Sequence, residues 1–270
     1  MKEKFHYKKS MGQHFLLDSA LVERLAEASG VQKGDGVLEV GPGRGLLTAA
    51  LARRARKLIA VELDLTLLNG LEVAMGLYPN VEIVQGDILK ADLPALVAEL
   101  GTPCRLAANL PYNITTPFLE KLLRARLPLQ SIALMVQKEA GARMLAQVGD
   151  EGYGPLSLLV GYYCTGETVL EVPAACFTPP PKVDSVFLRL TPREASPCPD
   201  VEEALLFRVI TASFAMRRKT MLNNLTAGFA LSREKAEALL LAADVPPSAR
   251  AETLDLQAFA RIVVGLSTTT

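Results

Sequence analysis

Residues 36–45 read GVLEVGPGRG, and the architecture expected for the whole chain follows from them. Gly36–Val40 is an apolar run typical of a buried strand, and the apolar spacing of Leu46–Arg54 predicts a helix after the turn. The G-x-G-x-G spacing that begins at Gly41 lets the chain turn tightly and lets a ligand lie against the main chain. This stretch alone leaves two interpretations open, a nucleotide site or an ordinary glycine-rich turn between strand and helix.

Strand and helix patterns then alternate along the chain. Short apolar runs are separated by segments with helical periodicity, and Asp18–Ala28 predicts one further helix before them. Because strands that alternate with helices form parallel sheets covered on both faces, the predicted fold class is α/β. The expected strands are 58–61, 81–84, 105–108 and 132–136, and the expected helices are 65–76, 116–125 and 140–147.

The pattern changes after Gly154. Leu156–Tyr163 and Val186–Leu190 are apolar runs that predict two more strands, which would add an antiparallel pair to the sheet edge. Residues 191–199 contain three prolines and predict a linker. We therefore expect a large domain over residues 1–190 and a small helical domain over residues 200–270. The helices expected in the small domain are 203–214, 217–225, 233–242 and 256–264.

The composition narrows the functional classes. The chain has 270 residues and only two histidines, His6 and His14, so a histidine-rich metal centre is excluded and we expect no metal. Its four cysteines form no C-x-x-C pair, which indicates reduced thiols in a cytoplasmic protein. No apolar run approaches the ~20 residues of a membrane helix, and the lysine-rich start is unlike a signal peptide. We expect no membrane association and, by default, a monomer.

The charge pattern gives only a weak indication of a nucleic-acid partner. The formal net charge is zero, which by itself does not favour a nucleic-acid partner. Local basic clusters occur at Lys8 and Lys9 and at Arg217–Lys219. Each cluster taken alone is typical of a solvated protein surface.

Acidic residues follow two of the expected strands. Glu62 ends the strand after the glycine-rich turn, where its carboxylate can accept hydrogen bonds from both ribose hydroxyls of a nucleotide. Asp87 follows the next strand and can accept from an adenine amine, while Ile88 can pack on the adenine ring. Each acid alone is more typical of a surface position. Together they predict a ligand site at the carboxyl edge of the sheet.

Asn109-Leu110-Pro111-Tyr112-Asn113 follows the fourth strand and carries the most specific chemistry. An adenine amine is a poor nucleophile because its lone pair is delocalised into the ring. The Asn109 side-chain oxygen and the Leu110 carbonyl can accept from both N–H groups, so that the lone pair points at a methyl carbon. Tyr112 can stack on the base, and orientation then supplies most of the catalysis. A plain turn after a strand is the alternative.

These motifs resemble those of the amino-methyltransferases, and more narrowly those of the ribosomal RNA adenine dimethyltransferase family. The resemblance runs from Gln13 to about Asn224. The matching elements are Gln13–Leu16, Glu39–Gly45, Val61–Asp64, Gly86–Ile88, Asn109–Tyr112, Gln137–Glu139 and Phe177–Ser185.

The resemblance implies a Rossmann-like class I methyltransferase that uses S-adenosyl-L-methionine and has a small C-terminal helical domain. It implies that the segment around His14 closes over the cofactor, although the family usually has Asn at that position. It also implies that Phe177 stacks on the target base opposite Tyr112. The expected catalytic residues are Asn109, Leu110, Tyr112 and Phe177. The expected cofactor residues are Gln13, His14, Leu16, Gly41, Gly43, Glu62, Asp87, Ile88 and Asn109.

The implied substrate is small-subunit ribosomal RNA. Asn109–Asn113 and Phe214–Asn224 are more similar to the small-subunit enzymes of the family than to the erythromycin-resistance methyltransferases. The implied targets are two adjacent adenines in a loop near the 3′ end, each dimethylated within a pre-formed 30S particle during ribosome biogenesis. The residues expected to bind the RNA are Lys8, Lys9, Arg217, Arg218 and Lys219.

Three alternatives remain at this point. A methyltransferase acting on another RNA or on DNA differs from the leading hypothesis only in substrate. A non-catalytic ribosome-assembly or transcription factor could keep the same fold, although intact Asn109 and Tyr112 argue against lost chemistry. A nicotinamide oxidoreductase shares the glycine-rich turn and Glu62 but not the segment that begins at Asn109.

Overall fold

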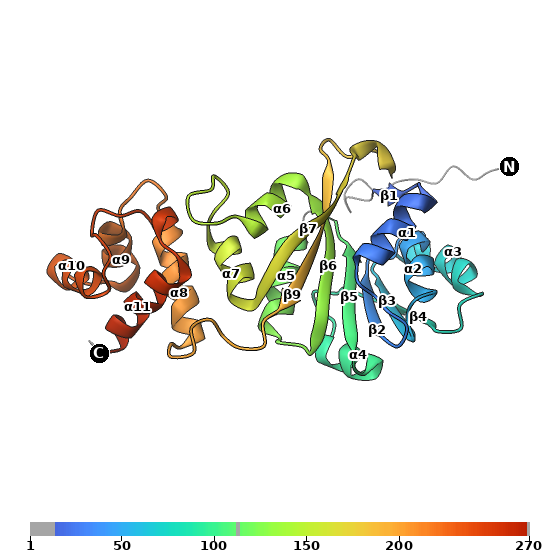
Figure 1. The fold of residues 1–270 in the computed structure, drawn as a ribbon, viewed down its shortest axis with the longest axis horizontal. Coiled ribbons are helices and arrows are strands. Elements are labelled where there is room, and N and C mark those ends of the chain that lie inside the picture. Colours follow the sequence, from blue (N-terminus) through green and yellow to red (C-terminus); the bar gives the residue numbers. More distant parts are fainter. Residues whose placement is uncertain (1–13, 112–113, 269–270) are drawn as a thin grey trace. The chain divides into compact units, whose positions relative to one another are not determined.

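The computed structural model of the chain describes residues 14–111 and 114–268. These residues divide into two compact units (Figure 1). The first comprises the described residues up to Gly141 together with Thr165–Pro192, and the second comprises Ala142–Cys164 and the described residues from Arg193 onward. Residues 142–164 thus group with the C-terminal helices, whereas the sequence placed them in the large domain. The assignment of a separate function to each unit stays a prediction.

A seven-stranded sheet forms the centre of the first unit, with the strand order β4-β3-β2-β5-β6-β9-β7. The strands from β2 to β6 pair in parallel, and β9 pairs antiparallel with β6. The parallel strands therefore present their carboxyl ends at one edge. Their bounds are β2 Gly36–Val40, β3 Lys57–Glu62, β4 Val81–Gln85, β5 Cys104–Asn109, β6 Leu129–Gln137, β7 Cys164–Val172 and β9 Ser185–Pro192. The sequence predicted a strand at 186–190, but in an antiparallel pair with 156–163.

Helices follow the strands, and aspartate side chains start several of them. Asp18, Asp64 and Asp92 each accept a hydrogen bond from a backbone N–H in the first turn of the helix that follows. The last of these helices, α4, was not foreseen from the sequence. The first-unit helices are α1 Ser19–Ala28, α2 Leu46–Ala52, α3 Leu65–Met75, α4 Leu93–Leu100 and α5 Thr115–Arg124, and α6 Lys138–Leu145 runs from this unit into the second.

The core of the first unit lies between the sheet and its helices. Leu25 from α1 and Leu51 from α2 are fully buried in one cluster with Val37 and Ala107 from neighbouring strands. A short antiparallel pair, β1 Phe15–Leu16 with β8 Phe177–Thr178, adds Leu16 and Phe177 to the same cluster. This pairing joins segments that are far apart in the sequence, and the sequence did not predict it.

The segment expected as a strand at 156–163 is a helix, α7 Pro155–Tyr163, and this prediction was wrong. Pro155 suits the first position of a helix, and the Gly154 N–H donates to Ser157 Oγ at 3.2 Å. Tyr162 and Tyr163 pack on Phe207, with ring centroids 5.2 and 6.0 Å apart. The helix is apolar nearly all round because it is buried, so the sequence shows no helical period. A strand does follow, but it begins only after this helix, as β7 at Cys164.

The second unit is built from α7 and four further helices: α8 Glu203–Phe214, α9 Met221–Phe229, α10 Arg233–Ala242 and α11 Leu256–Ser267. The helix expected to start at 217 starts only at Met221, because Thr220 caps it by accepting from Asn223 N–H. The Asn224 side chain donates to the carbonyls of Ser213 and Met216, which closes the turn between α8 and α9. Residues 217–219 therefore lie on a turn and not in a helix.

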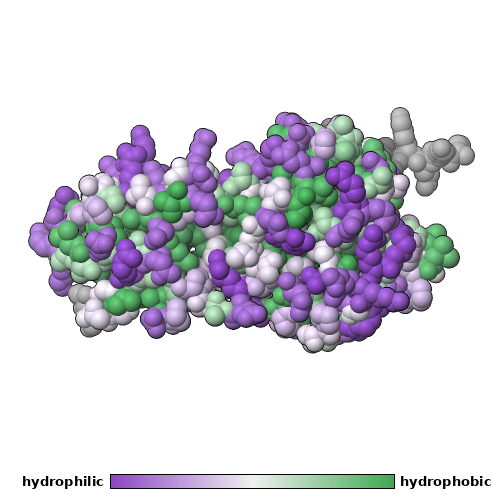
Figure 2. Space-filling view, in the orientation of Figure 1, coloured by the Kyte–Doolittle hydropathy of each residue, from purple (hydrophilic) through white to green (hydrophobic). Residues whose placement is uncertain are grey.

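Hydrophilic side chains cover much of the face shown in Figure 2, with smaller hydrophobic patches between them. This distribution fits a chain whose apolar residues are largely used in the two cores. Within the described ranges, none of the helices has both the length and the hydropathy needed to cross a lipid bilayer.

A buried ion pair ties the amino end of the sheet together. Arg105 on β5 donates from Nε to Asp35 Oδ2 at 2.6 Å, and from Nη1 to Ser131 Oγ on β6 at 3.0 Å. The same Asp35 oxygen accepts from Gln32 N–H at 2.8 Å. The two charged side chains are only 16% and 5% exposed, so each depends on the other for compensation of its charge.

We expect Arg105→Met to lower the free energy of unfolding by about 3 kcal/mol, because it leaves the Asp35 carboxylate buried without its cation. Urea denaturation measures this loss. The matched control is Lys138→Met, which breaks a pair with Glu171 whose side chains are 56% and 68% exposed and should cost less than about 1 kcal/mol. Equal losses of unfolding free energy in the two variants would contradict the stabilising role of the buried Arg105–Asp35 pair.

Candidate active site

The glycine-rich turn after β2 lies directly beside two of the expected cofactor segments. Gly41 and Gly43 have φ values of +73° and +59°, a conformation that side chains with a Cβ rarely adopt. A Cβ at Gly41 would lie 3.2 Å from the backbone oxygen of Asn109, and one at Gly43 would lie 2.9 Å from the ring of Phe15. The turn is therefore in close contact with the end of β5 and with the N-terminal segment.

Glu62 connects this turn to the end of β3. Its Oε2 accepts from the Gly43 N–H at 3.1 Å, and its Oε1 accepts from the Asp64 N–H at 2.8 Å. The side chain is buried, and burial raises the pKa of Glu62, while the two N–H donors act in the opposite direction. Each carboxylate oxygen has a second lone pair, so the group can still accept from ligand hydroxyls.

The turn after β4 carries Asp87 and Ile88 next to Glu62. Gly86 N–H donates to the Glu62 carbonyl at 2.9 Å, which joins the ends of the neighbouring strands β3 and β4. Asp87 Oδ1 accepts from Leu89 N–H at 3.0 Å, and Ile88 is buried. The acids that the sequence placed at strand ends are therefore on adjoining turns.

The N-terminal segment packs between the glycine-rich turn and the segment around Phe177. The His14 Nδ1 lies 2.6 Å from the carbonyl oxygen of Pro179, and the guanidinium carbon of Arg44 lies 5.1 Å from the centre of the Phe15 ring. Leu16 pairs with Phe177 in the β1–β8 ladder. Gln13, the first residue of the expected cofactor segment, is outside the described residues.

Phe177 is only 3% exposed and belongs to the hydrophobic core cluster. Stacking on a target base would require the segment around it to move, so this role stays a prediction. Its expected partner Tyr112 is outside the described residues.

Asn109 and Leu110 lie at the end of β5, next to the glycine-rich turn. The Pro111 carbonyl accepts from Ile114 N–H at 3.1 Å and from Thr115 Oγ1 at 3.2 Å, so the start of α5 fixes the turn that follows Leu110. The two predicted acceptors for the target amine are thus held from both sides, by β5 and by α5.

Glu39 is a buried acid to which the sequence gave no role, although it interrupts the apolar run of β2. It is 1% exposed, and its Oε2 has no hydrogen-bond partner among the described residues. Burial raises the pKa of Glu39 to about 8, against the opposite effect of the nearby Thr48 hydroxyl, and the charge of Glu62 contributes in the same direction as burial. The carboxyl is therefore mostly protonated at neutral pH.

The basic residues expected to bind RNA are not all described. Arg217, Arg218 and Lys219 are exposed on the turn between α8 and α9 of the second unit, whereas Lys8 and Lys9 are outside the described residues. A common basic rim formed by these five residues therefore stays a prediction.

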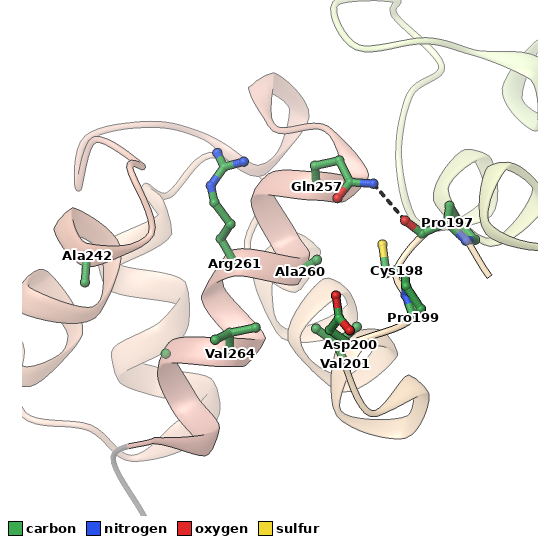
Figure 3. A pocket seen from close by; sticks show the side chains of 11 residues that line it. Pro197, Cys198, Pro199, Asp200, Val201, Ala242, Gln257, Ala260, Arg261 and Val264 are labelled. Carbon is green, nitrogen blue, oxygen red and sulfur yellow. Dashed lines mark hydrogen bonds between the residues drawn. The ribbon is translucent and has the colours of Figure 1, made fainter.

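A cavity of 360 Å³ in the second unit lies between the linker at 197–201 and α11 (Figure 3). Gln257 Nε2 donates to the Pro197 carbonyl at 2.9 Å along its side. Ala242, Arg261 and Val264 are among its other lining residues. It contains none of the residues predicted for cofactor or base binding, so we assign no part of that chemistry to it.

The sheet order, the glycine-rich turn and the acids on adjoining strand ends define a Rossmann-like methyltransferase fold. Two solved structures are similar over most of the chain. A dimethyladenosine transferase from Plasmodium falciparum has a TM-score of 0.82 at 27% identity, covering 94% of this chain and 98% of that one. The 23S rRNA methyltransferase ErmE has a TM-score of 0.70 at 28% identity, covering 94% and 99%.

The sequence comparisons agree with this class. The family model described as ribosomal RNA adenine dimethylase matches residues 4–265, and the chain belongs to this family. The ribosomal RNA small subunit methyltransferase A of Shouchella clausii is 45% identical, covering 99% of this chain and 92% of that protein. The protein of the same name from Geobacillus thermodenitrificans is 43% identical, covering 96% and 90%.

Because its pKa is raised in the native state, Glu39 makes the free energy of unfolding fall as pH rises. Below the ordinary carboxyl pKa of 4.5 the group is protonated in both states. As pH rises, the unfolded state loses this proton first, so the native state loses stability until pH passes about 8. Between pH 5 and pH 8, the free energy of unfolding of Glu39→Gln should fall less than that of the wild type, by on the order of 3 kcal/mol, as measured by urea denaturation. If the two curves against pH were parallel, Glu39 would not have the raised pKa.

Proposed function

We propose that this chain transfers methyl groups from S-adenosylmethionine to the N6 amines of two adjacent adenosines in a loop near the 3′ end of small-subunit ribosomal RNA. Each adenosine receives two methyl groups during ribosome biogenesis. The observation that carries the proposal is the convergence of the glycine-rich turn, Glu62 and Asp87 beside Asn109 at one edge of the sheet. The names of the full-length relatives support the same substrate.

The described residues fit an adenosyl cofactor. Without Cβ atoms, the glycine-rich turn packs directly on Asn109 and Phe15, which keeps its main chain close to the end of β5. A buried carboxyl oxygen of Glu39, which has no hydrogen-bond partner among the described residues, lies in the strand that leads into this turn. Glu62 would accept from the ribose hydroxyls, Asp87 would accept from the adenine amine, and Ile88 would pack on the adenine. His14 and Leu16 would close the site. The chemistry that S-adenosylmethionine supplies when bound is a methyl group on a positively charged sulfonium.

The residues at the end of β5 would orient the target. In the first transfer, Asn109 Oδ1 and the Leu110 carbonyl would accept hydrogen bonds from the two N–H groups of the adenine amine, which directs the nitrogen lone pair at the methyl carbon. The methylated amine would then release one proton to solvent, and in the second transfer the single remaining N–H would be held by one of the two acceptors. Tyr112 and Phe177 hold the base by stacking after it has left its own stack. Both acceptors are neutral, so their contribution is orientation and local electrostatics.

The proposed partner is the RNA within a pre-formed 30S particle, and the proposed acting form is a cytoplasmic monomer. The exposed turn with Arg217, Arg218 and Lys219 would contact phosphates, together with Lys8 and Lys9. A chain with zero formal net charge would depend on such local clusters for its attraction to RNA.

Asn109→Ala tests the catalytic assignment. We expect it to lower kcat by roughly 10²–10³-fold, because one preorganised acceptor is lost. Although Asn109 is also among the expected cofactor residues, calorimetry should show largely intact cofactor affinity, because the other expected cofactor residues remain. The assay follows labelled methyl groups from S-adenosylmethionine into small subunits that lack adenine dimethylation, with nucleoside analysis of the product. The control is Asn69→Ala on the exposed side of α3, which should behave like the wild type.

Normal turnover in Asn109→Ala would disprove its role as an acceptor. A wild-type protein that binds the cofactor but labels no small-subunit adenosine would instead redirect the substrate to another nucleic acid.

Arg217→Ala combined with Lys219→Ala tests the RNA surface. If both cations contact phosphates, the slope of log K against log salt concentration should become shallower by about 1.4, since single-stranded contacts contribute about 0.7 each. Filter binding across a salt series measures this slope. The matched control is Arg233→Ala with Lys235→Ala, an exposed pair of the same spacing on α10. An unchanged slope in the first variant, or equal changes in both, would rule out this turn as the RNA contact.

A further inference from the structure

Lys121 makes an unusually complete set of hydrogen bonds outside the predicted site. It lies in the last turn of α5 and is partly buried. Its ammonium group lies 2.6 Å from the carbonyl oxygen of Ala91, 2.9 Å from that of Leu89 and 3.2 Å from that of Ile88. A lysine ammonium has three N–H donors and no acceptor, so these three carbonyls account for its full capacity.

The three carbonyls belong to the turn that presents Asp87. The N–H groups of Lys90 and Ala91 donate to the Asp87 carbonyl at 2.8 and 2.9 Å, and Leu89 N–H donates to the Asp87 side chain. These bonds close the turn on Asp87, while the carbonyls of Ile88, Leu89 and Ala91 accept from Lys121. Lys121 is the described side chain that binds them together.

The helix that carries Lys121, α5, also contacts the turn after the proposed amine acceptors. The helix starts directly after the turn that holds Asn109 and Leu110, and Thr115 in its first turn donates to the Pro111 carbonyl. One helix therefore contacts the turn after the proposed amine acceptors at its start and the turn with Asp87 near its end.

We propose that Lys121 is a positioning residue for cofactor binding, which fixes the turn at residues 87–91 so that Asp87 and Ile88 meet the adenine ring. The inference rests on the proposed function, because it takes Asp87 as the acceptor for the adenine amine. Lys121 acts through this turn and does not itself touch the ligand. Removing its ammonium releases three carbonyls to water and lets the turn sample other conformations, so that the bound geometry must be re-formed at each binding event.

The test compares Lys121→Met with Lys90→Met by calorimetric titration with S-adenosylmethionine. Lys90 is a matched control because its ammonium is in the same turn, 3.9 Å from Asp87, and its side chain is 86% exposed. Both changes remove one positive charge that contacts residues 87–91, but only the first removes the three carbonyl contacts. We expect Lys121→Met to weaken binding about 10-fold and Lys90→Met to stay within about twofold of the wild type.

Two further readouts separate positioning from a general loss of stability. In steady-state assays Lys121→Met should raise KM for the cofactor, while kcat at saturating cofactor stays within about twofold. In an Asp87→Ala background the same change should weaken binding less than about threefold, because the contact that it positions is already lost. Lys121→Gln, which keeps two N–H donors, should show an intermediate loss of affinity and serves if the methionine variant folds poorly.

The outcomes are distinguishable from those of the proposed function. A wild-type protein that does not bind S-adenosylmethionine would overturn the proposed function itself. If the wild type binds S-adenosylmethionine and both Lys121 variants bind it with the same affinity, only the role of Lys121 is overturned. A full 10-fold loss that persists in the Asp87→Ala background would show that Lys121 acts elsewhere, and would also overturn the inference.

Discussion

One carboxylate, that of Glu62, holds the turns of the site in register. Its two oxygens accept from the N–H groups of Gly43 and Asp64, and its backbone carbonyl accepts from Gly86 N–H. A single residue at the end of β3 thus joins the turn after β2, its own turn and the turn after β4. Parallel strands bring these turns to one edge of the sheet, and the hydrogen bonds of Glu62 set their spacing within that edge. Gly43 also has a positive φ, a backbone conformation that favours glycine at this point of the turn.

Burying acids in this way has an electrostatic cost. Glu62 and Glu39 are both buried, and burial raises the pKa of each, with the Glu62 charge adding to the effect on Glu39. Glu39 avoids most of the cost by keeping its proton, whereas Glu62 is compensated by backbone donors. A nicotinamide oxidoreductase would share the glycine-rich turn and Glu62, so these acids do not separate it from a methyltransferase. Membership of the ribosomal RNA adenine dimethylase family is what argues against the oxidoreductase alternative.

Local sequence signals predicted most of the sheet and the acids on it, because the strands β2 to β5 are short, mainly apolar runs, each ended or soon followed by a glycine, an acid or an asparagine. The signals failed where burial was complete or contacts were distant. Residues 156–163 are apolar on all sides, so the sequence could not separate the helix α7 from a strand. The pairing of Leu16 with Phe177 and the contact of Lys121 with residues 88–91 join segments far apart in the chain. No spacing rule within one segment can reveal them.

The proposed chemistry explains why so few ionisable groups are needed at the end of β5. An adenine amine already carries the two N–H groups that must be held, and neutral acceptors suffice to direct its lone pair. A charged base beside the sulfonium would bind the ground state as strongly as the transition state and would gain little rate. The demand on the protein is instead positional, since a displacement of the base or of the cofactor by a fraction of an ångström changes the line of attack. That demand gives a physical reason for the dense backbone hydrogen bonding of the site, in which Glu62 secures the turns of β2 to β4 and α5 secures the turn after Leu110.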